Sequence, residues 1–175
     1  NKWGQTPLDI ACAGGHAGIV RELLSAGSRV GANAVALCAM RGDAKLIAEL
    51  LDTGAPADEP STSDITPGMT PLMWAANRGH IDVARCLIAR GARIDAQDAQ
   101  GRTALMFVQA PAVAEYFVAA GANLDMSDAQ GFDAVAYHLD QAASLKRIDD
   151  NEMAERAEAV AEMIGRPRPT ENEND

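Results

Sequence analysis

The feature that most constrains the fold of this chain is a stretch that recurs along it, and its clearest copy is residues 68–97, GMTPLMWAANRGHIDVARCLIARGARIDAQ. Pro71 suits the first position of a helix, where its missing N–H costs nothing, and apolar residues then follow helical spacing as far as Gly79. A second run of helical spacing ends at Gly91, and residues 92–97 read as an extended arm. Such a helix–turn–helix–arm cannot cover its own apolar face, so it needs copies stacked beside it.

Copies lie on both sides of this stretch. Residues 4–27 repeat its Thr-Pro-Leu opening, its Gly-His turn and its closing glycine, and residues 101–121 repeat the Gly-x-Thr opening and the closing glycine. The step from Thr70 to Thr103 is 33 residues, which is the repeat length of ankyrin. Over residues 1–148 the pattern resembles the ankyrin repeat family.

This resemblance implies an all-α solenoid of stacked helix–turn–helix units with short β-hairpin arms. It places the units near residues 1–30, 31–67, 68–97, 98–127 and 128–148. In the last unit we expect Val135 and Leu139 to face inward.

Units two and four depart from the pattern. Gly42 follows Gly15 by only 27 residues, so the arm between units one and two is shortened. Residues 55–67 are longer than the arm that they replace, and their proline, serine and acidic residues are typical of a loop. This loop is either a tolerated surface insertion or a contact finger beside the arms. Unit four lacks the Gly-His turn, so residues 109–111 connect its helices directly.

The stack is predicted to end in a capping helix at residues 149–165, with its acidic side outward. Asp149 or Asp150 can cap the first turn, an apolar stripe follows at helical spacing, and Gly165 ends the helix. Residues 166–175 are too polar to pack, and we expect them to form a disordered acidic tail.

The net charge of −10 narrows the classes of partner. An acidic chain gains no affinity from counterion release, so we expect no nucleic acid partner, and an anionic membrane surface is disfavoured for the same reason. No apolar run approaches the ~20 residues of a membrane helix, and no secretory signal is present, so no membrane insertion is expected.

The chain begins at Asn1 without a polar capping helix, so either further repeats precede it or a partner covers that end.

The three cysteines favour reduced thiols. Cys12 and Cys38 fall on the inner helices of neighbouring units, which pack roughly 8–10 Å apart, whereas a disulfide needs Cα atoms within about 7 Å. Cys86 falls on an outer helix, remote from both. Unpaired thiols indicate an intracellular, cytoplasmic setting.

No catalytic residue, cofactor or metal ligand is predicted. His16 and His80 occupy equivalent positions two units apart, so roughly 16–20 Å separates them, and zinc needs its ligands within about 2.1 Å. The family resemblance implies instead that the Gly-His turn is structural, with its ring bonded to nearby backbone. We expect His138 to be a packed histidine. Since nucleophile and phosphate-loop motifs are also missing, we expect neither an enzyme nor a small-molecule substrate.

The resemblance implies that another protein binds the concave side of the stack, formed by the arm tips and the exposed face of each first helix. The matching positions are Lys2, Trp3, Gln5, Met40, Arg41, Met69, Asn77, Arg78, Gln100, Arg102, Gln130 and Phe132. Aromatic, Met and Arg side chains in one groove are typical of an interface centre. Arg41, Arg78 and Arg102 would make this groove locally basic, which suits an acidic contact surface on the partner.

Two other functions stay open beside this non-enzymatic protein-binding module, since a fold does not by itself fix a function. One is a structural accessory subunit, held in a larger assembly through the N-terminal end and the 55–67 loop. The other is a targeting domain attached to a larger enzyme.

Overall fold

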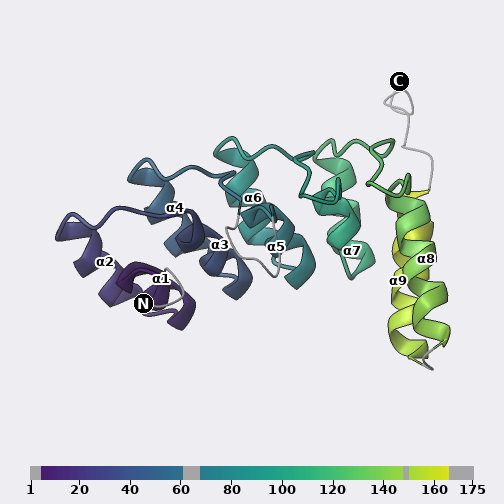
Figure 1. The fold of residues 1–175 in the computed structure, drawn as a ribbon, viewed down its shortest axis with the longest axis horizontal. Helices are drawn as coiled ribbons and strands as arrows, with labels where there is room; N and C mark the ends of the chain where they lie inside the picture. Colours follow the sequence, from purple (N-terminus) through teal and green to yellow (C-terminus); the bar gives the residue numbers. More distant parts are fainter. Residues whose placement is uncertain (1–4, 61–67, 148–149, 166–175) are drawn as a thin grey trace, which may run out of the picture.

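The computed structural model describes residues 5–60, 68–147 and 150–165, which form helix pairs stacked along one axis (Figure 1). The inner helices are α1 (Pro7–Gly14), α3 (Ala32–Arg41) and α5 (Pro71–Arg78), and their outer partners are α2 (Ala17–Ser25), α4 (Ala44–Asp52) and α6 (Ile81–Ala89). Unit four contributes the 3-10 turn η1 (Ala104–Phe107) and α7 (Pro111–Ala119), and the last pair is α8 (Ala134–Arg147) and α9 (Asn151–Ile164). The prediction of an all-α repeat solenoid is confirmed. Within these ranges, every helix is too short or too polar to cross a bilayer.

Threonine and glycine set the bounds of α1 and α5, as the sequence predicts. The Thr70 hydroxyl accepts a hydrogen bond from the Met73 N–H at 3.3 Å, and Thr6 makes the equivalent bond in α1, so a first-turn N–H is satisfied at each start. Gly79 ends α5 with φ 73°, a left-handed conformation that strains any residue with a Cβ. The same local rules therefore give α1 and α5 the same length of 8 residues.

The core is a continuous layer between the inner and outer helices. α3 packs between α1 and α5, and α5 packs in turn on α6 and η1. The side chains that this layer buries completely include Leu72, Ala75, Ala76, Val83, Ala84 and Leu87. Because a unit packs mainly on its neighbours, the core has no single centre.

The cysteines of the inner helices lie inside this layer as free thiols. Cys12 and Cys38 are both 0% exposed. Their side chains are hydrogen-bonded to each other, and this bond, with burial, raises the pKa of the Cys38 thiol. Cys86 is half-buried and also free, so the three thiols are unpaired in this structure.

The arms are turns, and the predicted β-hairpins are not seen in the described part of the chain. The Asp98 N–H donates to the Arg102 carbonyl at 3.0 Å, and Asp128 and Phe132 repeat this bond at 2.9 Å. One backbone–backbone bond, from the Ala129 N–H to the Gln100 carbonyl at 2.8 Å, joins the two arms. A hairpin needs a ladder of such bonds, but the aspartate side chains take the remaining turn N–H groups.

The described part of the 55–67 loop lies against the next unit. The Asp58 carboxylate accepts the Arg93 backbone N–H at 2.9 and 3.0 Å and the Arg93 Nε–H at 3.1 Å. This contact ties the start of the loop to the arm of unit three. Residues 61–67 lie outside the described ranges, so both readings of the loop stay open.

In unit four the inner helix is reduced to the single turn of η1. The chain is extended at Val108 (φ −66°, ψ 142°) and again at Ala110 (φ −144°, ψ 139°), and Pro111 then opens α7. A residue before proline is disfavoured in the helical region, so this connection follows from the sequence. The inner layer therefore loses the turns of helix that would fill the space between α5 and α8.

The stack ends in a pair of long helices, α8 and α9, that lie side by side (Figure 1). Asp150 caps α9 by accepting the Met153 N–H at 3.2 Å, and Gly165 follows its last turn. Residues 166–175, expected to be a disordered tail, lie outside the described residues. The expectation that Leu139 faces inward is wrong, because its side chain is 50% exposed while the neighbouring His138 is 4% exposed. The buried stripe of α8 runs through positions 134, 138 and 142, which leaves Leu139 on the outer side.

Candidate functional site

The expected partner-binding residues fall into two rows at opposite ends of the inner helices. We call Met40, Arg41, Asn77 and Arg78 the helix-end row, because they close α3 and α5. We call Gln100, Arg102, Gln130 and Phe132 the arm row, because they lie in the arm turns. The inner helix of a unit spans about 12 Å, at 1.5 Å for each of its residues, and separates the two levels. Half-buried Gln5 lies just before α1, and Lys2 and Trp3 lie outside the described residues.

Met69 does not belong to this surface. Its side chain is only 3% exposed and packs in the apolar core. The opening of unit three places Met69 directly before the buried cap Thr70, so it points into the stack. Sequence reasoning could not separate this methionine from an exposed one, because both positions are compatible with the repeat pattern.

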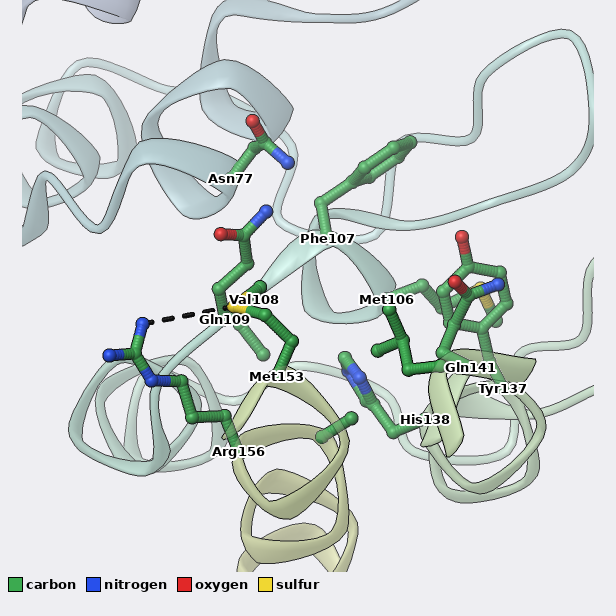
Figure 2. Close-up of a pocket in the computed structure, with 12 residues that line it drawn as sticks. Asn77, Met106, Phe107, Val108, Gln109, Tyr137, His138, Gln141, Met153 and Arg156 are labelled. Atoms are coloured by element: carbon green, nitrogen blue, oxygen red, sulfur yellow. Dashed lines mark hydrogen bonds between the residues drawn. The ribbon is translucent and has the colours of Figure 1, made fainter. Parts of the chain in front are cut away.

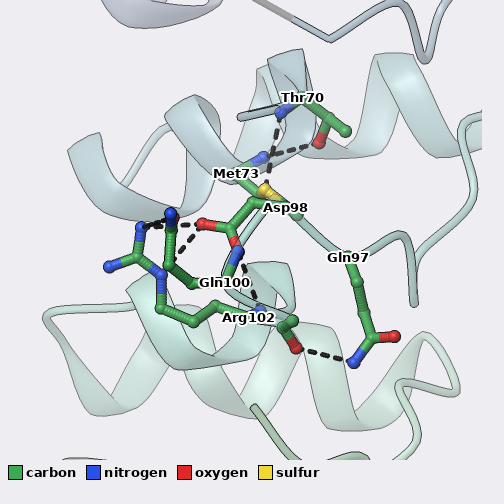
Figure 3. Close-up of polar contacts among 7 residues, drawn as sticks. Thr70, Met73, Gln97, Asp98, Gln100 and Arg102 are labelled. Carbon is green, nitrogen blue, oxygen red and sulfur yellow. Dashed lines mark hydrogen bonds and ion pairs between the residues drawn. The ribbon is translucent and has the colours of Figure 1, made fainter. Parts of the chain in front are cut away.

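Arg102 is held by a buried carboxylate instead of offering a free charge (Figure 3). Asp98 Oδ1 accepts the backbone N–H groups of Gln100 and Arg102, each at 2.9 Å. Its Oδ2 accepts from the Arg102 Nε at 2.9 Å and from a terminal guanidinium nitrogen at 2.7 Å. The guanidinium also lies over the Phe107 ring, 4.6 Å from its centroid. The role of Arg102 is therefore to fix the arm turn.

The next arm turn has the same aspartate but lacks the arginine. Asp128 Oδ1 accepts the N–H groups of Gln130 and Phe132 at 2.9 and 3.0 Å. Its buried Oδ2 has no hydrogen-bond partner among the described residues, since Phe132 stands where the preceding turn has Arg102. A buried carboxylate oxygen without a donor is costly, so this turn is held less firmly than its neighbour.

Arg41 bonds the preceding unit, a role that sequence reasoning missed. One terminal nitrogen of its guanidinium donates to the Ala13 carbonyl at 3.0 Å, beside the end of α1. His80 makes a similar contact one unit further on, since its Nε2 lies 3.3 Å from the Met40 carbonyl near the end of α3. Neither contact neutralises a charge, so Arg41 keeps its positive charge at the surface.

Arg78 is the exposed cation of the helix-end row that has no bonded partner within the described ranges. It occupies the same position in α5 as Arg41 in α3, directly before the left-handed glycine that ends each helix. The local basic character expected of the groove therefore rests on Arg41 and Arg78, and Arg102 contributes little to it.

His138 is a buried, neutral packing residue, as predicted. Its Nε2 lies 3.0 Å from the Leu105 carbonyl, which joins α8 to η1. Burial lowers its pKa, although the bond to Leu105 acts in the opposite direction. Elsewhere in the described part of the chain, His, Cys, Asp and Glu side chains do not gather in groups of three that could hold a metal ion.

A cavity of about 260 Å³ lies where unit four has lost its inner helix. Figure 2 shows it between the end of α5, the η1 turn and the two terminal helices. Sequence reasoning missed this cavity, and the signal that could have found it was the missing Gly-His turn of unit four.

Comparison with known proteins gives two matches to protein families. Residues 35–128 match the family model described as ankyrin repeats (3 copies), and residues 3–36 match that of a single ankyrin repeat.

Individual relatives match over part of their length. Cyclin-dependent kinase inhibitor 2A of Monodelphis domestica is 38% identical over 101 residues, or 54% of this chain and 57% of the relative. The ankyrin repeat, SAM and basic leucine zipper domain-containing protein 1 of Equus caballus is 44% identical over 52 residues, or 30% of this chain and 10% of the relative. The poly(ADP-ribose) polymerase tankyrase of Caenorhabditis elegans is 29% identical over 83 residues, or 47% of this chain and 4% of the relative. The chain thus spans about half the length of the first of these proteins and a small part of the others.

Proposed function

We propose that this chain, which belongs to the ankyrin repeat family, is a non-enzymatic module that binds another protein through the concave groove of its stack. The ankyrin repeat is a general protein–protein interaction module. The observation that carries the proposal is the helix-end row, in which two guanidinium groups without an acidic partner among the described residues lie at equivalent positions of adjacent inner helices. One of the relatives is named as an inhibitor of cyclin-dependent kinases, and inhibition by binding needs no catalytic residue in the inhibitor.

The same row defines the chemistry of the partner. α3 and α5 pack side by side, so Arg41 and Arg78 start from backbones roughly 8–10 Å apart. Arginine is suited to carboxylates because its planar fork can bond both oxygens at once. We infer that the partner presents acidic residues at this spacing, with Met40 and Asn77 contacting the surface between them.

Arg78→Glu is the variant that tests this proposal, because Arg78 makes no bond within the described structure. Arg41 is a poorer choice, since its guanidinium also bonds the Ala13 carbonyl. We expect affinity for the acidic partner to fall about tenfold or more when the charge is reversed. The measurement is affinity purification from the native source followed by mass spectrometry, with wild type and variant compared quantitatively.

Lys45→Glu is the matched control, because Lys45 is exposed on the outer helix α4 and also carries a single positive charge. A protein that is depleted with Arg78→Glu and retained with Lys45→Glu supports the helix-end row. If the wild type, Arg78→Glu and Lys45→Glu all recovered every stoichiometric partner equally, the helix-end row would be excluded as the binding surface.

A targeting domain of a larger enzyme is the second candidate. The relative from Caenorhabditis elegans is named as a polymerase, and this chain covers 4% of it. An immunoblot of the native source, with an antibody against residues 68–97, measures the size of the endogenous protein. A product much larger than 18.4 kDa that carries an enzyme domain would favour this candidate over a free-standing module.

A structural accessory subunit stays open as the third candidate. Two large apolar side chains of unit one, Ile10 and Ile19, are 52% and 50% exposed, which suits a covered surface in an assembly. This reading predicts that Ile10→Asp loses a stoichiometric partner that Arg78→Glu retains.

A further inference from the structure

The cavity beside η1 is built by four elements that come together only in the folded chain. The helix end of α5 supplies Asn77, η1 and the residues after it form one wall, and α8 and α9 close the far side (Figure 2). Its volume of about 260 Å³ falls below the ~300–1,000 Å³ of pockets that hold whole drug-sized ligands. The space fits an anchoring side chain with its flanking backbone better than an entire small molecule.

Much of the lining is apolar and adaptable. The apolar residues come from η1 and its exit and from the facing helices: Met106, Phe107, Val108, Leu145, Met153 and Ala157. Methionine has an unbranched, polarisable side chain that adjusts to the shape of what it contacts. This lining favours a large aliphatic or aromatic side chain.

Three carboxamides surround this lining. Figure 2 shows Asn77 and Gln109 on one side of the cavity and Gln141 on the other. None of the three side chains has a hydrogen-bond partner in the described part of the chain. Each carries both donors and an acceptor, which matches the alternating N–H and C=O groups of an extended peptide.

The charge of the lining is positive. Arg156 is the ionised side chain among the lining residues, since burial lowers the pKa of His138 and keeps its ring neutral near pH 7. Arg156 pairs with Glu152 at 2.6 Å, but the side chains of both residues are exposed, so the ion pair holds the arginine weakly. Arg78, which is next in sequence to the lining residue Asn77, has no acidic partner in the described structure. An acidic residue next to the anchoring side chain of the ligand would complement the positive charges of Arg78 and Arg156.

We propose that this cavity binds an extended segment of the partner protein, with one large apolar side chain in the cavity and an acidic residue near Arg156. The inference rests on the proposed function, because it identifies which part of the partner the groove would hold. The three carboxamides would bond the backbone of the segment on either side of its anchor.

The test uses three dipeptide probes and the intact chain. The methyl resonances of Met106, Met153 and Leu145 are followed by NMR during titration with acetyl-Leu-Asp-amide, acetyl-Ala-Asp-amide and acetyl-Leu-Lys-amide. We expect saturable shifts with the first probe and about tenfold weaker binding of the alanine probe, which loses most of the buried apolar side chain. Binding of the lysine probe should also be several-fold weaker, because its charge faces Arg156.

Two variants connect these shifts to the cavity. Ala157→Phe fills the space and should abolish the shifts. Gln141→Ala changes an exposed residue and keeps the space open, so it should fold normally and weaken the leucine probe several-fold. The proposal would be overturned if the shifts did not saturate, or if both variants bound acetyl-Leu-Asp-amide as tightly as the wild type does. It would also be overturned if acetyl-Leu-Asp-amide bound no more tightly than acetyl-Ala-Asp-amide or acetyl-Leu-Lys-amide.

The outcome is separable from that of the proposed function. A partner lost with Arg78→Glu but retained with Ala157→Phe and Gln141→Ala would leave the groove as the binding surface and remove the cavity from it. Retention of every partner by Arg78→Glu would instead count against the proposed function, whatever the probes do.

Discussion

At the scale of single residues, the two arm turns show how one substitution changes the strength of a repeated element. Both turns use an aspartate whose Oδ1 accepts two backbone N–H groups. Only in the first does an arginine reach Oδ2, although both aspartates are equally buried, each 7% exposed. Arg102 and Phe132, both expected to contact a partner, therefore first of all set the stability of the arms.

Arg102→Met should lower the free energy of unfolding by about 1–3 kcal/mol, because it leaves the buried Asp98 Oδ2 without a donor. Urea unfolding followed by circular dichroism measures the change. No loss of stability would mean that water reaches Asp98 and replaces the guanidinium.

Phe132→Arg should act in the opposite direction and raise the free energy of unfolding by about 1 kcal/mol, because it supplies the donor that Asp128 lacks. The same substitution in an Asp128→Asn background is the control, and there the gain should disappear. A gain of equal size in that background would assign the effect to something other than the carboxylate.

At the scale of elements, the inner helices are bounded by local rules, and their contacts with one another decide what is exposed. Thr70 and Gly79 fix α5, and equivalent residues fix α1. Between units, Arg41 and His80 bond carbonyl groups of the preceding inner helix. These bonds join consecutive units, and the repeat pattern indicated a structural role for His80 but not for Arg41.

Two glycine substitutions test the local rules with opposite expected signs. Gly79→Ala should lower the free energy of unfolding by about 1–2 kcal/mol, because alanine is strained at φ 73°. Gly18→Ala lies inside α2, where an added Cβ meets no heavy atom within 4 Å, and should raise stability by about 0.5–1 kcal/mol. Chemical denaturation of both variants checks the pair, and the same sign for both would contradict this account of the helix ends.

At the scale of the whole molecule, the stack closes where α8 and α9 cover the reduced unit four. His138 stands at this junction, buried and bonded to the Leu105 carbonyl. Since a solenoid is stabilised by the sum of its neighbour contacts, a change at this junction acts on the stability of the whole end of the stack.

Stability should fall as the pH drops below about 6.5, the ordinary pKa of histidine. Burial lowers the pKa of folded His138, so this histidine binds a proton more readily in the unfolded chain than in the folded one. The stability that the neutral, buried ring contributes is therefore present above pH 6.5 and is lost as the pH falls toward the folded pKa. Thermal unfolding between pH 7.5 and 5.5 measures this dependence. The His138→Gln variant should not show this loss of stability, while its other groups titrate as before. If the variant had the same pH profile as the wild type, His138 would be excluded as the source of the loss.

The sequence by itself determined the helices and their stacking, because both depend on local signals. Thr-Pro at the starts of α1 and α5, glycine at the ends of α1, α3 and α5, and apolar residues at helical spacing specify these helices without reference to the rest of the chain. The missing Gly-His turn likewise indicated that unit four is irregular. These signals act over a few residues, so they can be read directly from a single sequence.

Only the tertiary structure decided which surface residues are free. Met69 is buried, Arg102 is paired and Arg41 bonds a neighbouring unit, although all three occupy positions compatible with an open groove. Leu139 faces solvent, and a cavity opens beside η1. Each of these outcomes depends on side chains brought together from different units, and the distances that decide burial and pairing exist only once the units have stacked.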